Sequence, residues 1–277
     1  MPISDRRLSR HRAKIVGDVE FPMANGSPDG NRIIQSLWIG SPLSLMETLC
    51  IRSYLSHGHE FHLYTYGDVG NIPAGTTLRD ANEIMPQSVA DRFKYKANFS
   101  DYFRFTMLLK GGWYVDMDSI CLRPLDFPSE YVFGSCGCDT MYNPVSDLSS
   151  SVGKFIGSAF IKAPDSNEIM EYCRGCVENW LQGAEQIYDE PMRIIQRAIA
   201  KFGFEEYVQA PIVFDPVPYH KLVDVVNPAT SWDLKKAYVV HLSRSGWLGG
   251  SAAHQELNVD GKYPANCLFE QLKRMYL

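Results

Sequence analysis

The apolar residues of this chain fall into short runs that alternate between strand-like and helix-like spacing. Residues 33–40 form a mostly apolar run that ends at a glycine, which is typical of a buried strand. Apolar residues at helical spacing between 45 and 55 predict a helix, and residues 61–66 predict a second strand. A strand, a helix and a strand in this order predict parallel pairing through a right-handed crossover. Such sheets bind ligands at the carboxyl ends of their strands, which is where the sequence predicts a site.

The same alternation continues to the end of the sequence. Residues 87–110 predict one helix that is stopped by Gly111 and Gly112, and residues 113–115 restart the chain as a strand. Further strands are predicted at 131–135, 155–162 and 237–242, and further helices at 168–181, 192–201 and 268–277. The complete pattern predicts an α/β fold.

The first thirty residues differ from the rest, because they show little apolar periodicity and end in the turn-forming run 25–30. We interpret residues 1–30 as an N-terminal tail and residues 31–277 as one domain. The basic residues Arg6, Arg7, Arg10, Arg12 and Lys14 indicate a solvated tail, with contact to an anionic membrane surface as the alternative. No apolar run has the length of a signal peptide or a membrane span, so any membrane contact is expected to be peripheral.

The charge balance and the cysteines indicate which kinds of partner and which cellular compartment suit the protein. The 277 residues include 32 acidic and 27 basic ones, giving a formal net charge of -5, so no global basic field exists to attract nucleic acid. An anionic substrate therefore needs a local positive site, and a divalent cation is the simplest one. Seven cysteines, an odd number, argue against a full disulfide framework. We expect a reducing, cytoplasmic location, with any membrane contact at its inner face.

Two aspartates, Asp116 and Asp118, follow the predicted strand 113–115. In an extended segment, residues two apart face the same side, so the two carboxylates are expected to converge where the strand ends. Their repulsion is relieved by a divalent ion with oxygen ligands, either Mn²⁺ or Mg²⁺. An Asp-x-Asp triplet is common by chance, and a solvated pair of acids at a strand end is the alternative.

Asp101 and Arg104 lie three residues apart on the helix that precedes this strand, so they share one helix face. An arginine held by a carboxylate can still donate hydrogen bonds to a phosphate or a sugar hydroxyl. The alternative is an ordinary surface ion pair, which contributes under about 1 kcal/mol. The neighbouring run Gly-Gly-x-Tyr-x-Asp-x-Asp favours the first interpretation.

The combination of Ser-Asp-x-x-Arg at 100–104 with Gly-Gly-x-Tyr-x-Asp-x-Asp at 111–118 resembles the DXD-containing sugar transferases. These include small bacterial capsule and lipopolysaccharide transferases, fungal mannosyltransferases and the large clostridial glucosylating toxins. The resemblance is specific over residues 97–125, extends plausibly over 32–270, and is absent over 1–30. It implies a GT-A fold, which is a Rossmann-like mixed sheet flanked by helices, and retention of the anomeric configuration.

The resemblance also implies roles for matching residues. Asp118 matches the direct metal ligand, and Asp116 matches the carboxylate that contacts the donor ribose or sugar and the metal. Asp101 and Arg104 match the clamp on the donor sugar, and with Asp116 they form the expected catalytic set. Trp38 and Ile39, at the end of the first strand, match the position beside the nucleotide base, although Trp38 also suits a plain core aromatic.

The segment 239–247 resembles the family's late His…Ser-x-Trp motif, in which the histidine or a nearby side chain completes the metal shell and serine and tryptophan touch the diphosphate. His241 is therefore a candidate metal ligand, because neutral imidazole suits Mn²⁺, although a lone histidine at a strand end is often structural. Gly246 stands between Ser245 and Trp247, so the match leaves open whether Ser243, Ser245 or Trp247 makes the diphosphate contact.

Two departures from the family pattern stand out. Many relatives have an asparagine where this chain has Ser158, and a Gly-Pro pair where this chain has Glu190-Pro191. Asp189 or Glu190 is therefore a candidate to face the reaction centre, although acids also favour helix N-termini for electrostatic reasons. Zinc bound by Cys136, Cys138, Cys173 and Cys176 is the less favoured use of the cysteines, because the two pairs are irregularly separated.

These observations predict a glycosyltransferase that moves a sugar from a nucleotide-sugar donor, with UDP-hexose favoured, to a glycan or lipid-linked glycan acceptor. The loops 136–152 and 248–262 are the expected acceptor walls, because loops carry specificity. Two alternatives stay open. One is a metal-dependent hydrolase of nucleotide sugars, which normally needs ligands for a second metal ion. The other is a domain that binds a nucleotide sugar without turnover.

Overall fold

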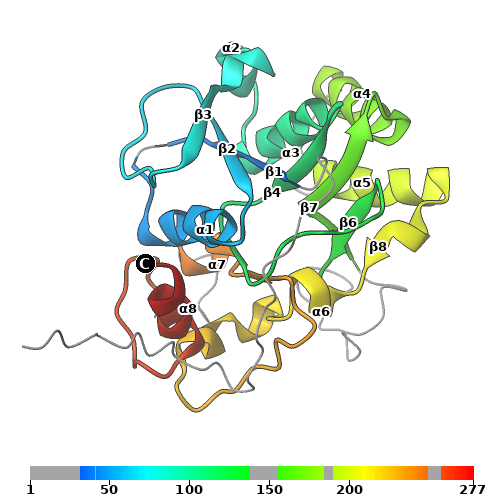
Figure 1. Ribbon diagram of the computed structural model, residues 1–277. Coiled ribbons are helices and arrows are strands. Elements are labelled where there is room, and N and C mark those ends of the chain that lie inside the picture. The colour runs from blue at the N-terminus through cyan, green and yellow to red at the C-terminus, as the bar shows by residue number, and fades with distance from the viewer. Residues whose placement is uncertain (1–31, 41, 138–154, 184–189, 249–256) are drawn as a thin grey trace, which may run out of the picture.

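A seven-stranded mixed sheet forms the centre of the protein. The computed structural model describes residues 32–40, 42–137, 155–183, 190–248 and 257–277 (Figure 1). The strands lie in the order β3-β2-β1-β4-β7-β6-β8, and β7 runs antiparallel to its neighbours β4 and β6. Their bounds are β1 Ile33–Trp38, β2 Glu60–Thr65, β3 Thr76–Asp80, β4 Lys110–Val115, β6 Val132–Ser135, β7 Ile156–Asp165 and β8 Val208–Gln209. The expected GT-A type of fold, a mixed sheet flanked by helices, is confirmed.

A second, two-stranded sheet joins distant parts of the chain. It pairs β5 (Ser119–Cys121) antiparallel with β9 (Val239–His241), with Ser119 opposite His241. The α-helices are α1 Leu45–Ser56, α2 Gln87–Ala90, α3 Lys96–Met107, α4 Glu168–Gln182, α5 Glu190–Phe202, α6 Pro211–Phe214, α7 Arg244–Trp247 and α8 Leu268–Tyr276, and the 3₁₀ helices are η2 Ala81–Glu83, η3 Glu205–Tyr207 and η4 Tyr219–Val226. No described helix is both long and apolar enough to cross a membrane.

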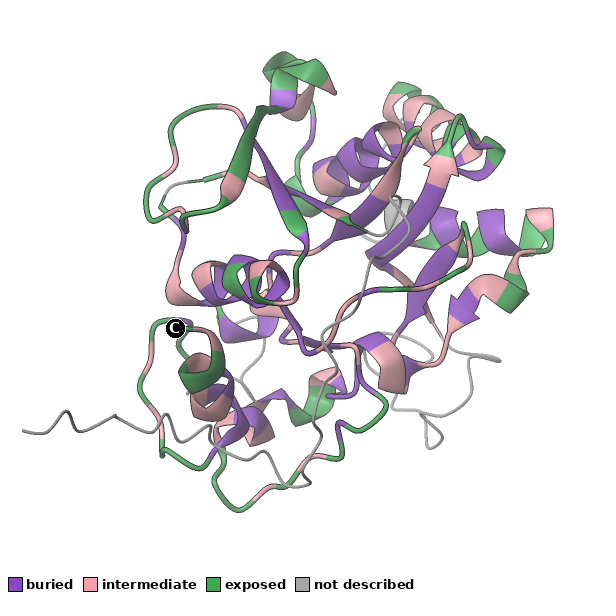
Figure 2. Cartoon of the chain, in the orientation of Figure 1, coloured by how far each residue is buried: buried purple, intermediate pink, exposed green. Residues whose placement is uncertain are grey.

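Two hydrophobic cores lie on opposite faces of the large sheet. Side chains of β4 alternate between them: Trp113 and Val115 pack into the core with α1, α6 and α8, whereas Tyr114 packs into the core with α3, α4 and α5. The central strands are consequently buried on both faces, while the helices expose their outer sides (Figure 2). The edge strand β3 is largely exposed, which explains why its sequence shows no hydrophobic pattern.

The predicted parallel pairing of the first two strands is confirmed, with Ile33 opposite Glu60 and Trp38 opposite Thr65. The predicted helix at 87–110 is wrong in its extent, because the chain forms α2 and then α3 with a break between them. The late strand is shorter than expected, since only residues 239–241 pair. The short strands β3, β5 and β8 were not predicted, because two or three residues carry no readable period and β3 is exposed.

Gly111 and Gly112 do not stop a helix, as the sequence suggested, but lie inside β4. Both have positive φ, of 75° and 98°. A Cβ atom on Gly111 would come within 2.8 Å of the Asp165 backbone nitrogen, and one on Gly112 within 2.8 Å of Gln35 Nε2. The pair therefore allows the close approach of β4 to β7 and β1, which sets where the strand delivers Asp116.

Candidate active site

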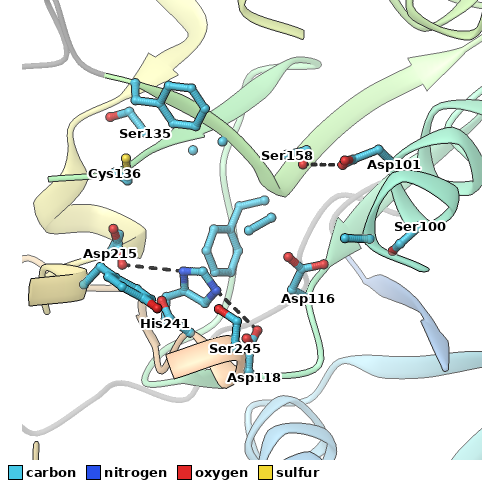
Figure 3. Close-up of a pocket in the computed structure, with 18 of the residues that line it drawn as sticks. Ser100, Asp101, Asp116, Asp118, Ser135, Cys136, Ser158, Asp215, His241 and Ser245 are labelled. Atoms are coloured by element: carbon cyan, nitrogen blue, oxygen red, sulfur yellow. Dashed lines mark hydrogen bonds and ion pairs between the residues drawn. The ribbon is translucent and has the colours of Figure 1, made fainter. Parts of the chain in front are cut away.

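A cavity of about 330 Å³ opens beside the carboxyl end of β4. Its walls come from α3, from the adjoining strands β6 and β7, from the segment that includes the end of α6 and the start of η4, and from the start of α7. Acidic, histidine and serine side chains line it on several sides (Figure 3). Phe155 and Phe160 contribute apolar surface. This is the edge of the sheet at which the sequence predicted a site.

The two aspartates of the motif converge, but not because the strand continues through them. The strand β4 ends at Val115, and Asp118 lies in the turn that leads to β5. The Asp118 backbone oxygen accepts a hydrogen bond from the Leu242 amide at 2.8 Å, and its Oδ2 accepts one from the Arg244 amide at 2.6 Å. The turn and these two bonds, rather than strand alternation, orient the Asp118 side chain.

Asp116, Asp118 and His241 each offer one ligand atom, and these three atoms lie within 4.8 Å of one another. Among the described residues, this is the one cluster of three or more possible metal-ligating side chains. Asp118 Oδ1 is buried, has no hydrogen-bond partner among the described residues and lies 3.3 Å from His241 Nε2. Two carboxylates and an imidazole form a donor set that fits Mn²⁺ or Mg²⁺, with the nitrogen favouring Mn²⁺.

The electrostatics of this cluster favour a positive charge beside Asp118. Burial alone would raise the pKa of Asp118 and lower that of His241. The attraction between the two groups outweighs burial, so the pKa of Asp118 is lowered and that of His241 is held well above its usual value. The raised pKa of His241 favours its protonated form, and a bound metal ion would replace that proton.

The Asp101–Arg104 pair is formed, with Arg104 Nε 3.3 Å from Asp101 Oδ1. It is not the exposed ion pair of the alternative interpretation, because only 3% of Asp101 and 4% of Arg104 is accessible to solvent. Arg104 Nη2 also lies 3.0 Å from Asp116 Oδ1, and Nη1 donates to the Ser158 carbonyl. Each guanidinium nitrogen thus has a protein partner, so Arg104 connects α3, β7 and the DXD motif.

Ser158, the residue found where many relatives have asparagine, belongs to this network. Its hydroxyl donates a hydrogen bond of 2.5 Å to Asp101 Oδ1. Arg104 additionally donates from Nη2 to the Ser100 hydroxyl at 3.1 Å, and its guanidinium lies over the Tyr114 ring at 4.4 Å from the centroid. A buried network that reaches Asp116 through Arg104 therefore fixes the Asp116 carboxylate. The carboxylate itself is directed at the cavity (Figure 3).

The structure does not bring every predicted residue to the cavity. Ser243 and Ser245 line it, whereas Trp38, Ile39 and Trp247 do not. Trp247 is only 2% exposed and donates its indole N–H to the Leu242 carbonyl at 2.7 Å, so it has no donor left for a diphosphate. The Arg244 guanidinium lies over the Trp38 ring, 5.3 Å from the ring centroid, and the Trp38 indole N–H has no hydrogen-bond partner within the part of the chain that the structure describes.

Some candidates lie outside the described residues. These are Asp189, Cys138 and the parts of the expected acceptor walls at 138–154 and 249–256. Residues 1–31, which include the expected tail, also lie outside them.

Sequence reasoning assigned no role to three charged residues around the Asp116–Asp118–His241 cluster: Glu47, Asp215 and Arg244. Glu47 is fully buried at the start of α1, where its Oε2 accepts the Ser44 amide in a capping box at 2.7 Å. Its Oε1 accepts from Arg244 Nε at 2.6 Å. The Ser-x-x-Glu spacing at 44–47 was a readable capping signal, but the partner 197 residues away was not.

Glu47→Gln is expected to lower the free energy of unfolding by about 1–3 kcal/mol, because it weakens a buried, charge-assisted hydrogen bond that ties α7 to α1. Urea denaturation measures this change. Glu171→Gln is the matched control, since Glu171 lies in the first turn of α4 and pairs with Arg174 at the exposed surface. A loss in Glu47→Gln no larger than in the control would contradict this role of Glu47.

The comparison with protein families agrees with the sequence resemblance to glycosyltransferases over part of the chain. Residues 49–133 match the family described as "Glycosyltransferase sugar-binding region containing DXD motif". The matched segment spans less than half of the chain and carries Asp101, Arg104, Asp116 and Asp118, the residues on which the sequence resemblance rested.

Two solved structures are similar to the chain. One, "PaToxG Glycosyltransferase", is 13% identical with a TM-score of 0.39, covering 62% of this chain and 69% of that chain. The other, a transferase with two cysteine-to-serine substitutions, is 11% identical with a TM-score of 0.37, covering 70% of this chain and 91% of that chain. The comparison with curated proteins finds no match.

Proposed function

We propose that the protein transfers a hexosyl group from a nucleoside diphosphate sugar, with UDP as the favoured nucleotide, to a glycan or lipid-linked glycan acceptor. The observation that supports this proposal most directly is the Asp116–Asp118–His241 cluster beside a cavity at the carboxyl end of β4. Two of its members, Asp116 and Asp118, lie within the segment that matches a sugar-binding DXD region. A cavity of about 330 Å³ suits a sugar with part of its diphosphate.

Within this proposal, Asp116, Asp118 and His241 hold a divalent ion. A bound Mn²⁺ or Mg²⁺ would offset the negative charge that develops on the leaving diphosphate. Asp116 also faces the donor, and its carboxylate is fixed by Arg104 through a 3.0 Å contact. Ser243 and Ser245 offer hydroxyl groups from the cavity wall to the phosphates.

We propose that transfer retains the anomeric configuration, with the acceptor attacking from the face that the diphosphate leaves. The departing phosphate oxygen then accepts the acceptor's proton, so the reaction needs no dedicated side-chain base. The alternative in which two carboxylates act as nucleophile and acid requires a pair about 5 Å apart that is free to react. Asp116 and Asp118 do not suit those roles, because one is bound to Arg104 and both face the proposed metal.

A panel of UDP- and GDP-sugars tests the proposal. The protein is incubated with each donor in Mn²⁺ or in EDTA, without and with glycan acceptors, and the released nucleoside diphosphate and sugar products are measured. We expect release from one donor, abolished by EDTA and increased by the correct acceptor. Mass spectrometry and NMR of the product then give the linkage and its anomeric configuration.

The two alternative functions give different results in the same experiment. Rapid donor cleavage that no acceptor increases would indicate a nucleotide-sugar hydrolase. Metal-dependent donor binding in calorimetry with no product from any acceptor would indicate a binding domain. Turnover that is unchanged in EDTA would contradict the metal-dependent mechanism.

A further inference from the structure

We propose that Asp215 is a positioning residue that holds His241 with its Nε2 atom directed at the Asp116–Asp118 pair. Asp215 follows α6 and lines the cavity, and no sequence motif indicated it. The assignment rests on the proposed function in one respect, because it takes the cluster to be a metal site. It adds to that function the residue that selects which ring nitrogen of His241 faces the metal.

The imidazole ring lies between two carboxylates. His241 Nε2 is 3.3 Å from Asp118 Oδ1, and His241 Nδ1 is 3.5 Å from Asp215 Oδ1, so the two nitrogens point in opposite directions (Figure 3). The ring also meets the Phe160 ring edge to face, with centroids 5.4 Å apart and planes at 88°. These three contacts leave the imidazole little freedom to rotate.

Metal binding requires one particular form of the imidazole. A neutral imidazole carries its proton on one nitrogen and a lone pair on the other, and only the lone pair can bind a metal ion. Nε2 faces the two aspartates, so the proton must be on Nδ1. An ionised carboxylate accepts hydrogen bonds but does not donate them, so Asp215 at Nδ1 stabilises this tautomer.

Asp215 is itself positioned by the core rather than by solvent contacts. The preceding residue, Phe214, is fully buried and stacks on Phe160 with ring centroids 5.2 Å apart and an interplanar angle of 12°. Phe160 is the same ring that contacts His241. The Asp215 amide also donates to the Pro211 carbonyl at 2.7 Å. Phe160 therefore contacts His241 directly and Asp215 through the neighbouring residue Phe214, so one aromatic side chain helps to place both.

The burial of Asp215 indicates that its carboxylate has a specific purpose. It is only 6% exposed, and beyond the 3.5 Å ionic contact with His241 its Oδ1 atom has no hydrogen-bond partner in the described part of the chain. Burying a carboxylate is unfavourable unless it is paired, and His241 is the ionic partner that the described residues supply. A purely structural role would be better served by an apolar residue in this aromatic surrounding.

Calorimetric titration with Mn²⁺ tests the proposal on the full chain. We expect Asp215→Ala to weaken Mn²⁺ binding by about 10–100-fold, the usual effect of removing a carboxylate behind a ligating histidine. Asp215→Asn should weaken Mn²⁺ binding less than Asp215→Ala, because its amide oxygen can accept a hydrogen bond from Nδ1–H. Asp233→Asn, a change of an exposed aspartate elsewhere in the same region, should bind like the wild type.

The ring nitrogens of His241 give a second, independent measurement. In the Mg²⁺-saturated wild type, ¹⁵N NMR should show a protonated Nδ1 and an unprotonated Nε2, with the signals assigned by their absence in His241→Gln. The opposite tautomer would overturn the proposal, and this measurement does not depend on whether Asp215→Ala folds. Wild-type Mn²⁺ affinity in folded Asp215→Ala would also overturn it.

Asp118→Ala separates the failure of this proposal from the failure of the proposed function. If Asp118→Ala loses Mn²⁺ binding while Asp215→Ala keeps it, the metal site stands and the positioning role of Asp215 is wrong. If Asp118→Ala binds Mn²⁺ like the wild type, the cluster is not the metal site, and both proposals fall.

Discussion

Arg104→Ala is expected to destabilise the protein by about 3–5 kcal/mol, which is a large share of the stability of an ordinary domain. The variant leaves Asp101 buried with the Ser158 hydroxyl but without its cationic partner. Burial already raises the pKa of Asp101 even with Arg104 beside it, so removing the arginine adds to the cost of the charge. The free energy of unfolding in urea measures the loss.

The chain offers a matched control in Arg174→Ala. Arg174 pairs with Glu171 at the same three-residue spacing, but the pair lies at the surface of α4, where such contacts contribute about 0–1 kcal/mol. Arg104→Lys keeps the charge but cannot reach Asp101, Asp116 and the Ser158 carbonyl together, so an intermediate loss is expected. A loss in Arg104→Ala as small as in Arg174→Ala would contradict the network described for the site.

Under the proposed function, Asp118→Asn is expected to reduce turnover of the nucleotide-sugar donor by about 10³-fold or more, because a neutral amide is a poor ligand for Mn²⁺. This corresponds to the several kcal/mol that a metal contributes to a charged transition state, at about 1.4 kcal/mol for each tenfold change. The amide oxygen can still accept the Arg244 amide proton, so the turn should persist. Initial rates at saturating donor and Mn²⁺ measure the loss.

Asp118→Ala is expected to have a larger effect than Asp118→Asn. It removes the ligand and also leaves the Arg244 amide without its acceptor, so a further loss of about 1–3 kcal/mol in stability is expected. Asp126→Asn provides the control, since Asp126 is exposed in the same part of the chain. Full donor turnover in a folded Asp118→Asn protein would exclude Asp118 from the metal site.

Much of the fold was predictable because local pattern determines it. The run 33–40, the helical spacing after it and the run 61–66 gave β1, α1 and β2, and their parallel pairing followed from chain order. The merged helix at 87–110 shows the limit of the same reasoning, since apolar spacing persists across the break between α2 and α3. Glycines that look like a helix stop can equally allow two strands to approach closely, as Gly111 and Gly112 do.

The site was predictable only where its residues are close in sequence or match a motif. Asp101 with Arg104, and Asp116 with Asp118, are readable from spacing, and His241 was named from a resemblance. Asp215 and Glu47 had no such signal, because their partners His241 and Arg244 are distant in sequence and only the tertiary packing brings them together. The burial of Arg104 was equally unreadable, because the sequence around it does not show that Ser158 covers it.

The pairing of β5 with β9 makes the position of His241, the proposed third ligand, depend on strand register. Three residue pairs form this ladder, and Ser119 stands opposite His241. A slip of one residue would put Val240 or Leu242 in that place and turn the imidazole to the other face, because side chains alternate along a strand. Single-residue insertions within 237–242 should therefore inactivate the protein while those in the preceding loop at 227–233 are accommodated. The register of β5 and β9 is therefore as necessary to the proposed metal site as the identity of Asp116, Asp118 and His241.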